Sequence, residues 1–262
     1  MEIFPAEIRR SKMLDLIRER EFVKVADLSR LFGISEVTVR SDLDSLATGG
    51  DLQRVHGGAV LRSTRLRTEP SFEQSAVTAA SEKAAIGRAT AGLISPGESV
   101  FLDVGSTAAA VARSLVGRRD LDGVVVFTNG LNVALELEKG VPPLSVVVTG
   151  GTIRPRQHSL VNPMADVLLS KVNVTTAIIG CNGVHAVEGF TNVNLPEADI
   201  KRRMVAAAQR CIVVADGSKI DNVSVATVAE IDQIDIFVTG ISAPAKGIQG
   251  LREAGLTVLE AK

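Results

Sequence analysis

Residue types and segments that mark secreted, membrane or metal-binding proteins are scarce in this chain. The 262 residues include only two cysteines, Cys181 and Cys211, and both stand among apolar residues. Two are too few for a disulfide framework or a zinc knuckle, so we expect reduced core cysteines. The N-terminal segment lacks the apolar core of a signal peptide, and no apolar run approaches the ~20 residues that cross a bilayer. We therefore expect a cytoplasmic protein without a membrane segment.

Histidine is equally scarce, with three in the chain. His158 and His185 fall in expected loops, and no second ligand stands at a spacing typical of a metal site. Exposed polar side chains are the simpler interpretation. We expect no metal ion and no other cofactor.

An excess of positive charge is also missing, because the formal net charge is −1. The charge is unevenly distributed: residues 1–67 carry a net +2 and the remainder a net −3. Between Leu52 and Arg67 there are four arginines and no acidic residue. Such a segment can neutralise DNA phosphates locally, although Arg65 and Arg67 also fit a solvated linker.

Residues 23–42 have the pattern of a helix-turn-helix. Apolar residues recur at helical spacing on either side of a short turn, with Val25, Leu28 and Phe32 before it and Val39, Leu43 and Leu46 after it. Gly33 is expected to end the first helix, and Ser35 to cap the second. The outer face of the second helix then presents Thr38, Arg40 and Ser41, whose hydrogen-bonding groups suit a major groove.

A helix and a hairpin flank this motif and predict a winged variant. Upstream, Met13, Leu16 and Ile17 define a helix that closes the core. Downstream, the alternating residues 52–55 run into paired glycines that permit a tight turn, which places Arg54 and His56 near the tip of a wing. The alternative is a small helical domain whose surface charges are only solvated.

After a polar stretch that ends at Pro70, short apolar runs alternate with helical or loop segments, which predicts a second, α/β domain. A helix is expected from Ser81 to Ile94. The runs that we expect to be buried strands are Val100–Asp103, Val124–Phe127, Ser145–Val148, Thr176–Ile179, Cys211–Ala215, Ile236–Val238 and Leu256–Leu259. Continuous apolar strands separated by crossovers indicate a largely parallel sheet covered on both faces.

Polar, glycine-containing turns follow four of these strands. They are residues 103–107, 128–130, 149–151 and 216–219. Ligands of open α/β sheets bind at the carboxyl ends of the strands, where turn amides and helix N-termini point outward. Any one of these turns alone is more simply a turn, but four together indicate a binding edge.

The segment Asn182–Lys201 contains several glycines and a proline, and we expect it to be a long loop that lines the same site. Glu197 and Lys201 follow at i and i+4, near the start of a helix. An isolated pair of this kind is more simply an exposed helix pair, but these two residues follow the expected binding loop.

The sequences of both regions resemble those of the DeoR family of bacterial transcriptional regulators. In the first region the matching segments are ISEVTVRSDL and RVHGGA. In the second they are FLDVGST, VFTNGLNVALEL, VVVTGGTIRPRQHSLVNP, IIGCNGV, EADIKRRM and VVADGSK. The resemblance implies a winged helix-turn-helix at 1–61, a linker at 62–80 and an effector-sensing α/β domain at 81–262, similar in fold to sugar-phosphate isomerases and coenzyme A transferases.

The resemblance also implies two sets of binding residues. For DNA they are Ser35, Thr38, Arg40, Ser41, Arg54 and His56. For a phosphorylated sugar they are Asp103, Gly105, Ser106, Thr107, Thr128, Asn129, Gly150, Gly151, Glu197, Lys201, Asp216 and Lys219. We expect Lys219 to offset the phosphate charge and the three carboxylates to accept hydrogen bonds from sugar hydroxyls.

The expected function is that of a repressor of carbohydrate genes that binds double-stranded operator DNA and responds to a phosphorylated sugar. Reading two half-sites requires a homo-oligomer, a dimer or larger. Two other classes remain open: a sugar-phosphate isomerase with an appended DNA-binding domain, and an activator or adaptor without a ligand. We expect no enzyme activity.

Overall fold

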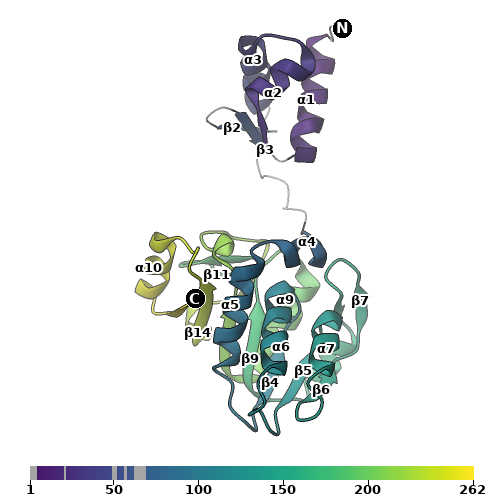
Figure 1. Cartoon of the computed structure of the whole chain (residues 1–262), viewed down its shortest axis with the longest axis vertical. Coiled ribbons are helices and arrows are strands. Elements are labelled where there is room, and N and C mark those ends of the chain that lie inside the picture. The colour runs from purple at the N-terminus through teal and green to yellow at the C-terminus, as the bar shows by residue number, and fades with distance from the viewer. Residues whose placement is uncertain (1–4, 21, 49–51, 56–57, 62–68) are drawn as a thin grey trace. The chain divides into compact units, whose positions relative to one another are not determined.

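The computed structural model describes residues 5–20, 22–48, 52–55, 58–61 and 69–262. The chain divides into two compact units, Met1–Thr68 and Glu69–Lys262 (Figure 1). The predicted linker extended to residue 80, but residues 69–80 belong to the second unit. Helix α4, Phe72–Val77, lies in this segment and begins with a capping box between Ser71 and Gln74.

The described residues of the first unit form a winged helix-turn-helix, as the sequence predicted. Its helices are α1 (Ala6–Arg20), α2 (Val25–Phe32) and α3 (Glu36–Thr48). An antiparallel sheet of order β1-β3-β2 contains β1 (Phe22–Lys24), β2 (Leu52–Val55) and β3 (Gly58–Leu61).

Local chemistry accounts for the short turn between α2 and α3. Gly33 adopts a left-handed conformation with φ 62°, which ends α2 as expected. The hydroxyl of Ser35 accepts a hydrogen bond from the amide of Thr38 at 3.1 Å and caps α3. The two helices pack through a core that includes Ile17, Leu28 and Leu43, all fully buried.

The second unit is built on a seven-stranded parallel sheet, and all seven predicted strands are confirmed. They are β4 (Ser99–Leu102), β5 (Val125–Thr128), β6 (Ser145–Val148), β9 (Val174–Gly180), β12 (Ala208–Val214), β14 (Ile236–Gly240) and β15 (Thr257–Ala261). The spatial order is β15-β14-β12-β9-β4-β5-β6. The strand order reverses between β4 and β9, so the ligand crevice expected for such a sheet lies at their carboxyl ends.

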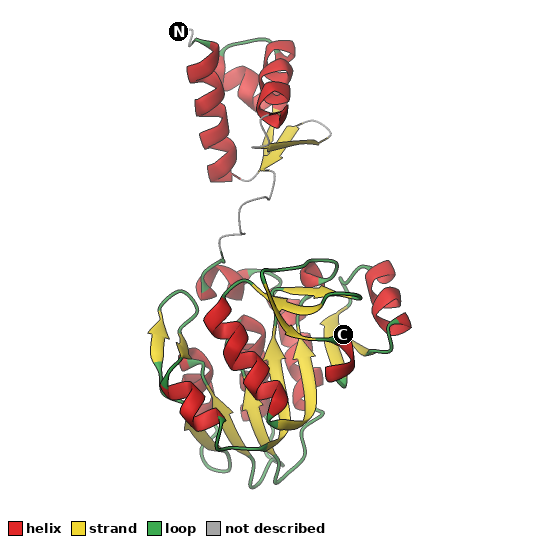
Figure 2. Ribbon diagram, turned by 180° about the vertical axis from the view of Figure 1, so that it is seen from behind, coloured by secondary structure: helices red, strands yellow, loops and turns green. Residues whose placement is uncertain are grey.

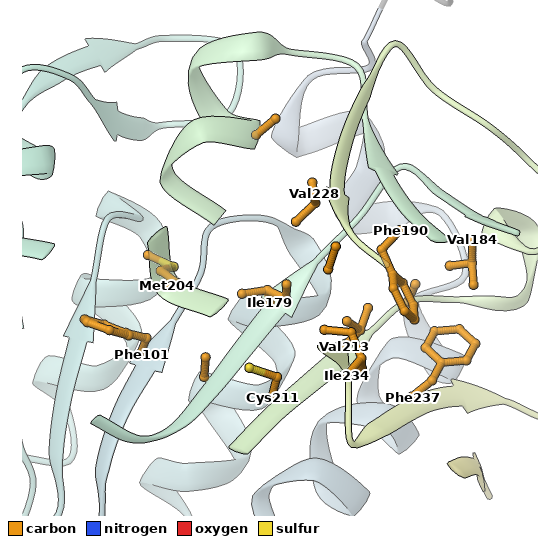
Figure 3. Packing of buried hydrophobic residues seen from close by; sticks show 14 of the residues in the cluster. Phe101, Ile179, Val184, Phe190, Met204, Cys211, Val213, Val228, Ile234 and Phe237 are labelled. Carbon is orange, nitrogen blue, oxygen red and sulfur yellow. The ribbon is translucent and has the colours of Figure 1, made fainter. Parts of the chain in front are cut away.

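Helices cover both faces of this sheet (Figure 2). On one face lie α5 (Ala80–Ala91), α6 (Ser106–Val116) and α7 (Leu131–Glu138), which pack on strand residues such as Leu102 and Ile178. The other face carries α8 (Met164–Leu169), α9 (Leu195–Ala206) and α10 (Ala245–Glu253). Figure 3 shows the core on that side, where Phe101, Ile179 and Phe237 are buried.

Shorter elements complete the second unit. One small sheet has the order β10-β11-β13, and β7 pairs with β8 in a hairpin. Their bounds are β7 (Thr152–Arg154), β8 (Ser159–Val161), β10 (Gly183–His185), β11 (Gly189–Asn192) and β13 (Ala226–Ala229). Two 3-10 turns are η1 (Gly217–Lys219) and η2 (Ile231–Gln233).

The expectation of a long loop over Asn182–Lys201 is wrong. The segment is the β10–β11 hairpin followed by α9, and its glycines allow close packing rather than an open loop. A Cβ atom on Gly183 would lie 2.4 Å from the carbonyl oxygen of Asn222, and one on Gly189 would lie 2.3 Å from that of Ala229.

None of the described helices is long and apolar enough to cross a membrane.

Asp42 on α3 is a buried charge of the first unit, and its substitution tests the packing of α1 on α3. Its carboxylate accepts hydrogen bonds from Arg9 at 2.7 Å and Arg10 at 2.9 Å. We expect Asp42→Asn to destabilise this unit by ~1.5–3 kcal/mol, the range for hydrogen bonds to charged groups. Asp27→Asn is the control, because its pair with Arg30 is exposed and contributes ~0–1 kcal/mol. Calorimetry of the full chain measures both; equal shifts would contradict a structural role for Asp42.

The same carboxylate makes this stability depend on pH. Burial alone would raise the pKa of Asp42, but the hydrogen bonds from Arg9 and Arg10 outweigh it and hold the pKa below its ordinary value. The stabilisation is therefore fully present above the pKa of an unfolded aspartate and is lost as the pH falls through the lowered folded value. Asp42→Asn should remove this acid dependence.

Candidate DNA-binding surface and effector site

The outer face of α3 is polar, as the sequence predicted. Ser35, Arg40 and Ser41 are exposed and Thr38 is partly exposed. The hydroxyls of Ser35 and Thr38 bond to each other at 2.9 Å, so both are positioned at the start of the helix. Sequence reasoning missed Val37, which is 72% exposed on the same face although its neighbour Val39 is buried. An exposed apolar side chain there can contact a thymine methyl group.

Arg40 has a partner in its own helix. Its guanidinium contacts the carboxylate of Glu36 at 2.6 Å, one turn earlier. Both side chains are about half exposed, and exposed pairs of this kind are weak. The pair therefore orients Arg40 without preventing it from exchanging Glu36 for a base or a phosphate.

The predicted wing is present as a hairpin. Residue Val55 pairs with Gly58, and Arg54 pairs with Ala59 across the two strands. Arg54 is thus on the wing strand β2, while His56 lies outside the described residues.

At the carboxyl ends of β4 and β9 in the second unit, Asp103 and Lys201 form a buried ion pair. Asp103 follows β4 directly, and Lys201 lies on α9. The ammonium of Lys201 contacts Asp103 Oδ2 and also donates to the carbonyl oxygen of Gly180 at 3.0 Å. Asp103 is fully buried and Lys201 is 3% exposed. The alternative interpretation of Glu197 and Lys201 as an exposed helix pair is therefore wrong.

The two charged groups of this pair differ in their hydrogen bonding. Asp103 Oδ2 also accepts the amide of Gly180 at 2.9 Å, yet the buried Oδ1 has no hydrogen-bond partner in the described part of the chain. Buried carboxylate oxygens normally have one. Burial disfavours the charged form of Lys201, but the charges of Asp103 and Glu197 outweigh it and raise the pKa of Lys201. Lys201 therefore stays protonated as a donor.

A second charged group surrounds Asp216, at the end of β12. Asp216 accepts a hydrogen bond from the amide of Ser218 at 3.1 Å, which caps the η1 turn. Lys83, on α5, lies 3.6 Å from the same carboxylate and is 5% exposed. Burial alone would raise the pKa of Asp216, but the Ser218 hydrogen bond and the charges of Lys219 and Lys83 outweigh it and lower the pKa. Asp216 is therefore an anion between two lysines.

Lys219 differs from the other two lysines. It is only partly buried and forms no ion pair within 4 Å among the residues that the structure describes, whereas Lys201 and Lys83 each have an aspartate partner.

Cys181 joins the two charged groups. Burial raises the pKa of its thiol to about 12. The charges of Lys201 and Lys219 lower this pKa, and those of Asp216 and Asp103 raise it, so the thiol is close to both charged groups. The thiol is therefore uncharged near neutral pH. Cys181 follows β9, as Asp103 follows β4, so Asp103, Cys181 and Asp216 lie at the carboxyl ends of three neighbouring strands, β4, β9 and β12.

Glu197, the third predicted carboxylate, is also buried. Its Oε1 atom accepts a hydrogen bond from the hydroxyl of Ser159 at 2.5 Å and pairs with the guanidinium of Arg154. Its charge acts on both Asp103 and Lys201. All three predicted carboxylates therefore have protein partners, and their contacts with sugar hydroxyls stay a prediction.

The first predicted turn has the geometry of an anion site. Gly105 precedes α6 with φ 116°, which only glycine adopts readily, and no side chain caps the helix. The amides of Ser106 and Thr107 belong to the first turn of α6, whose N–H groups have no acceptor within the helix. A helix start with this arrangement binds anions.

The remaining predicted residues have structural contacts. Thr128 accepts the amide of Gly130 at 3.1 Å, and Asn129 donates to the carbonyl oxygen of Leu160 at 3.3 Å, so both fix the turn after β5. At Gly151, a Cβ atom would lie 2.2 Å from the carbonyl oxygen of Val161, and only glycine fits. Gly150, with φ 72°, completes that turn. Among the described residues, no hydrogen bond joins these four residues to Asp103, Lys201, Asp216 or Lys219.

Sequence reasoning missed Lys83, Cys181 and Arg154. Lys83 could have been found, because it stands three residues before Ile86 on the buried stripe of α5. Cys181 was taken only as a core residue, although it follows a strand. Arg154 has no periodic signal, since its partners are distant in the sequence.

A comparison with solved structures matches ribose 5-phosphate isomerase A from Methanocaldococcus jannaschii, at 17% identity and a TM-score of 0.41, covering 54% of this chain and 55% of that one. Another match is a probable sor operon regulator from Shigella flexneri, at 11% identity and a TM-score of 0.40, covering 57% and 79% of the two chains.

Curated relatives are similar over nearly the whole chain. A putative aga operon transcriptional repressor of Escherichia coli O157:H7 is 34% identical over 96% of this chain and 92% of its own length. The transcriptional repressor AccR of Agrobacterium fabrum is 34% identical over 88% of each chain. The regulator GlpR of Haloferax volcanii is 33% identical over 98% of each.

Two family models match the two units in turn. Residues 9–65 match the DeoR-like helix-turn-helix domain, and residues 78–240 match the DeoR C terminal sensor domain. The winged fold and these matches agree: the chain belongs to the DeoR family of transcriptional regulators.

Proposed function

We propose that this protein is a repressor that binds operator DNA through α3 and the wing, and that a phosphorylated sugar in the second unit lowers its operator affinity. Two of the relatives are named as repressors, and the name of one of them refers to an operon, which supports repression. Two half-sites require at least a dimer, which is part of the proposal.

The observation that carries the effector assignment is the arrangement of charges at the carboxyl ends of β4, β9 and β12. Lys201 and Lys83 each lie within 4 Å of an aspartate, whereas Lys219 makes no such contact among the described residues, and the uncapped start of α6 adds a further preference for an anion. We assign the phosphate to Lys219 and the amides of residues 105–107, and the sugar hydroxyls to Asp103 and Glu197.

The proposal includes no catalytic turnover. Glu197 is paired with Arg154 and Ser159, while Asp103 is paired through Oδ2 and keeps Oδ1 for a hydrogen bond from the ligand. Incubation with ribose 5-phosphate, followed by an assay for the ketose product, tests this; turnover would favour the isomerase alternative.

Replacing Arg40 tests the DNA-binding face. We expect Arg40→Ala to weaken operator binding by ~1–3 kcal/mol, because a side chain that reads a base contributes about that much. Arg113→Ala is a matched control, since Arg113 is a similarly exposed arginine on α6 of the second unit. Gel-shift titrations at several salt concentrations measure both. If Arg40→Ala binds as tightly as the control, Arg40 does not contact DNA.

Replacing Lys219 tests the effector site. Lys219→Ala should keep operator affinity without sugar but lose the response to it, because the phosphate then lacks its cation. Lys246→Ala, at an exposed position on α10, is the control. Fluorescence anisotropy with labelled operator, with and without ribose 5-phosphate, fructose 6-phosphate or glucose 6-phosphate, reports the response. A normal response in Lys219→Ala would remove Lys219 from the site.

Comparing each sugar phosphate with its free sugar tests the ligand class. The free sugar leaves Lys219 and several amides without a partner, at ~1–3 kcal/mol for each group. We therefore expect calorimetry to detect the phosphorylated member of a pair and not the free one. Equal affinities for both members would contradict a phosphate site.

A further inference from the structure

Arg154 connects two carboxylates that are far apart in the sequence. It ends strand β7, and its guanidinium pairs through one nitrogen with Glu197 and through the other with Glu69. The three side chains are 18%, 4% and 8% exposed, respectively. Because a guanidinium offers a planar fork of donors, both pairs depend on one orientation of a single group.

Glu69 is the residue at which the second unit begins, directly after the chain leaves the DNA-binding unit. Its neighbours are held by the same loop. Arg156 donates to the carbonyl oxygen of Glu69, and Gln157 donates to that of Pro70 at 2.6 Å. The amide of Phe72 donates to the carbonyl oxygen of Arg156 at 2.9 Å. The first residues of the second unit are thus bound to the loop that follows Arg154.

Glu197 places the other end of this network in the effector site. It lies one turn before Lys201 on α9, and its charge acts on Lys201 and Asp103. A sugar hydroxyl that donates to Glu197 shares the carboxylate with Arg154 and Ser159. A change in the pair at one end of the guanidinium alters the pair at the other end, because both carboxylates bind the same, mostly buried group.

We propose that Arg154 couples the effector site to the DNA-binding unit, by pairing with Glu197 in the site and with Glu69 where the chain enters the second unit. This rests on the proposed function in placing the sugar against Glu197. Arg154 is a positioning residue: it binds neither sugar nor DNA. The network supplies a physical element that both ligands can bias, which a coupling between distant sites requires.

The first test removes the Glu69 end in the full-length protein. Glu69→Gln keeps the shape but removes the charge, and Glu69 contacts neither the assigned phosphate nor the hydroxyl groups. We expect the sugar phosphate to bind this variant within about threefold of wild type, while the ~5–150-fold loss of operator affinity typical of allosteric coupling falls to about twofold or less.

Glu73→Gln is the matched control. Glu73 stands in the same entry segment and contacts the same loop, through His158 at 2.8 Å, but does not touch Arg154. It should keep the wild-type response. The probe is whichever of ribose 5-phosphate, fructose 6-phosphate, glucose 6-phosphate or inorganic phosphate binds wild type in calorimetry. A full response in Glu69→Gln, or an equal loss in both variants, would overturn the coupling role of Arg154.

A second test needs no ligand. Either carboxylate alone can still compensate the buried guanidinium, but loss of both leaves it unpaired. The combined variant Glu69→Gln with Glu197→Gln should therefore lower Tm by more than the sum of the two single changes. Additive shifts would show that the carboxylates are independent and would overturn the proposal. If wild type binds none of the four probes but the shifts are non-additive, the proposed effector fails while the network stands.

Discussion

The buried pair of Asp103 and Lys201 is the interaction on which the second unit's site depends. It joins the end of β4 to α9, and through Gly180 it also reaches the end of β9, the two strands between which the sheet order reverses. Isolating either charge in this interior would cost several kcal/mol, so neither residue can change alone. Such a pair contributes little net stability compared with apolar packing, which indicates that its value lies in fixing the position of α9.

Fixing α9 orders the groups around it. Glu197 is held one turn earlier on the same helix, where it meets Arg154 and Ser159, and the thiol of Cys181 lies within range of both charged groups. The site and the entry of the chain into the second unit therefore share one set of buried charges. A packed interior of this kind changes between discrete arrangements rather than continuously, which is what a regulatory protein requires.

Most of the fold could be predicted because its signals are local. The seven strands are short apolar runs, and the caps at Gly33 and Ser35 act within one turn of the chain. The prediction of a loop at 182–201 was wrong because Gly183 and Gly189 were interpreted as loop residues. In the fold, the backbone of Asn222 and Ala229 packs directly against these glycines, and no local sequence pattern indicates such a contact.

The site could be predicted only in part. The turns after the strands identified Asp103 and Asp216, because the topology of a parallel sheet brings strand ends together whatever their separation in sequence. The partners of these residues could not be deduced, since Asp103 and Lys201 are 98 positions apart and Arg154 and Glu69 are 85 apart. Pairing at such distances is decided by the packed fold and not by spacing.

The central claim is that one protein state binds operator well and another binds the sugar phosphate well. Thermodynamic linkage makes this measurable from the side of the sugar. Calorimetric titration of the sugar phosphate into the free protein and into its operator complex compares the two affinities directly. The complex should bind the ligand more weakly, by the same factor by which the ligand weakens operator binding. Equal affinities in the two titrations would contradict the claim, because a ligand that does not distinguish the states cannot shift their populations.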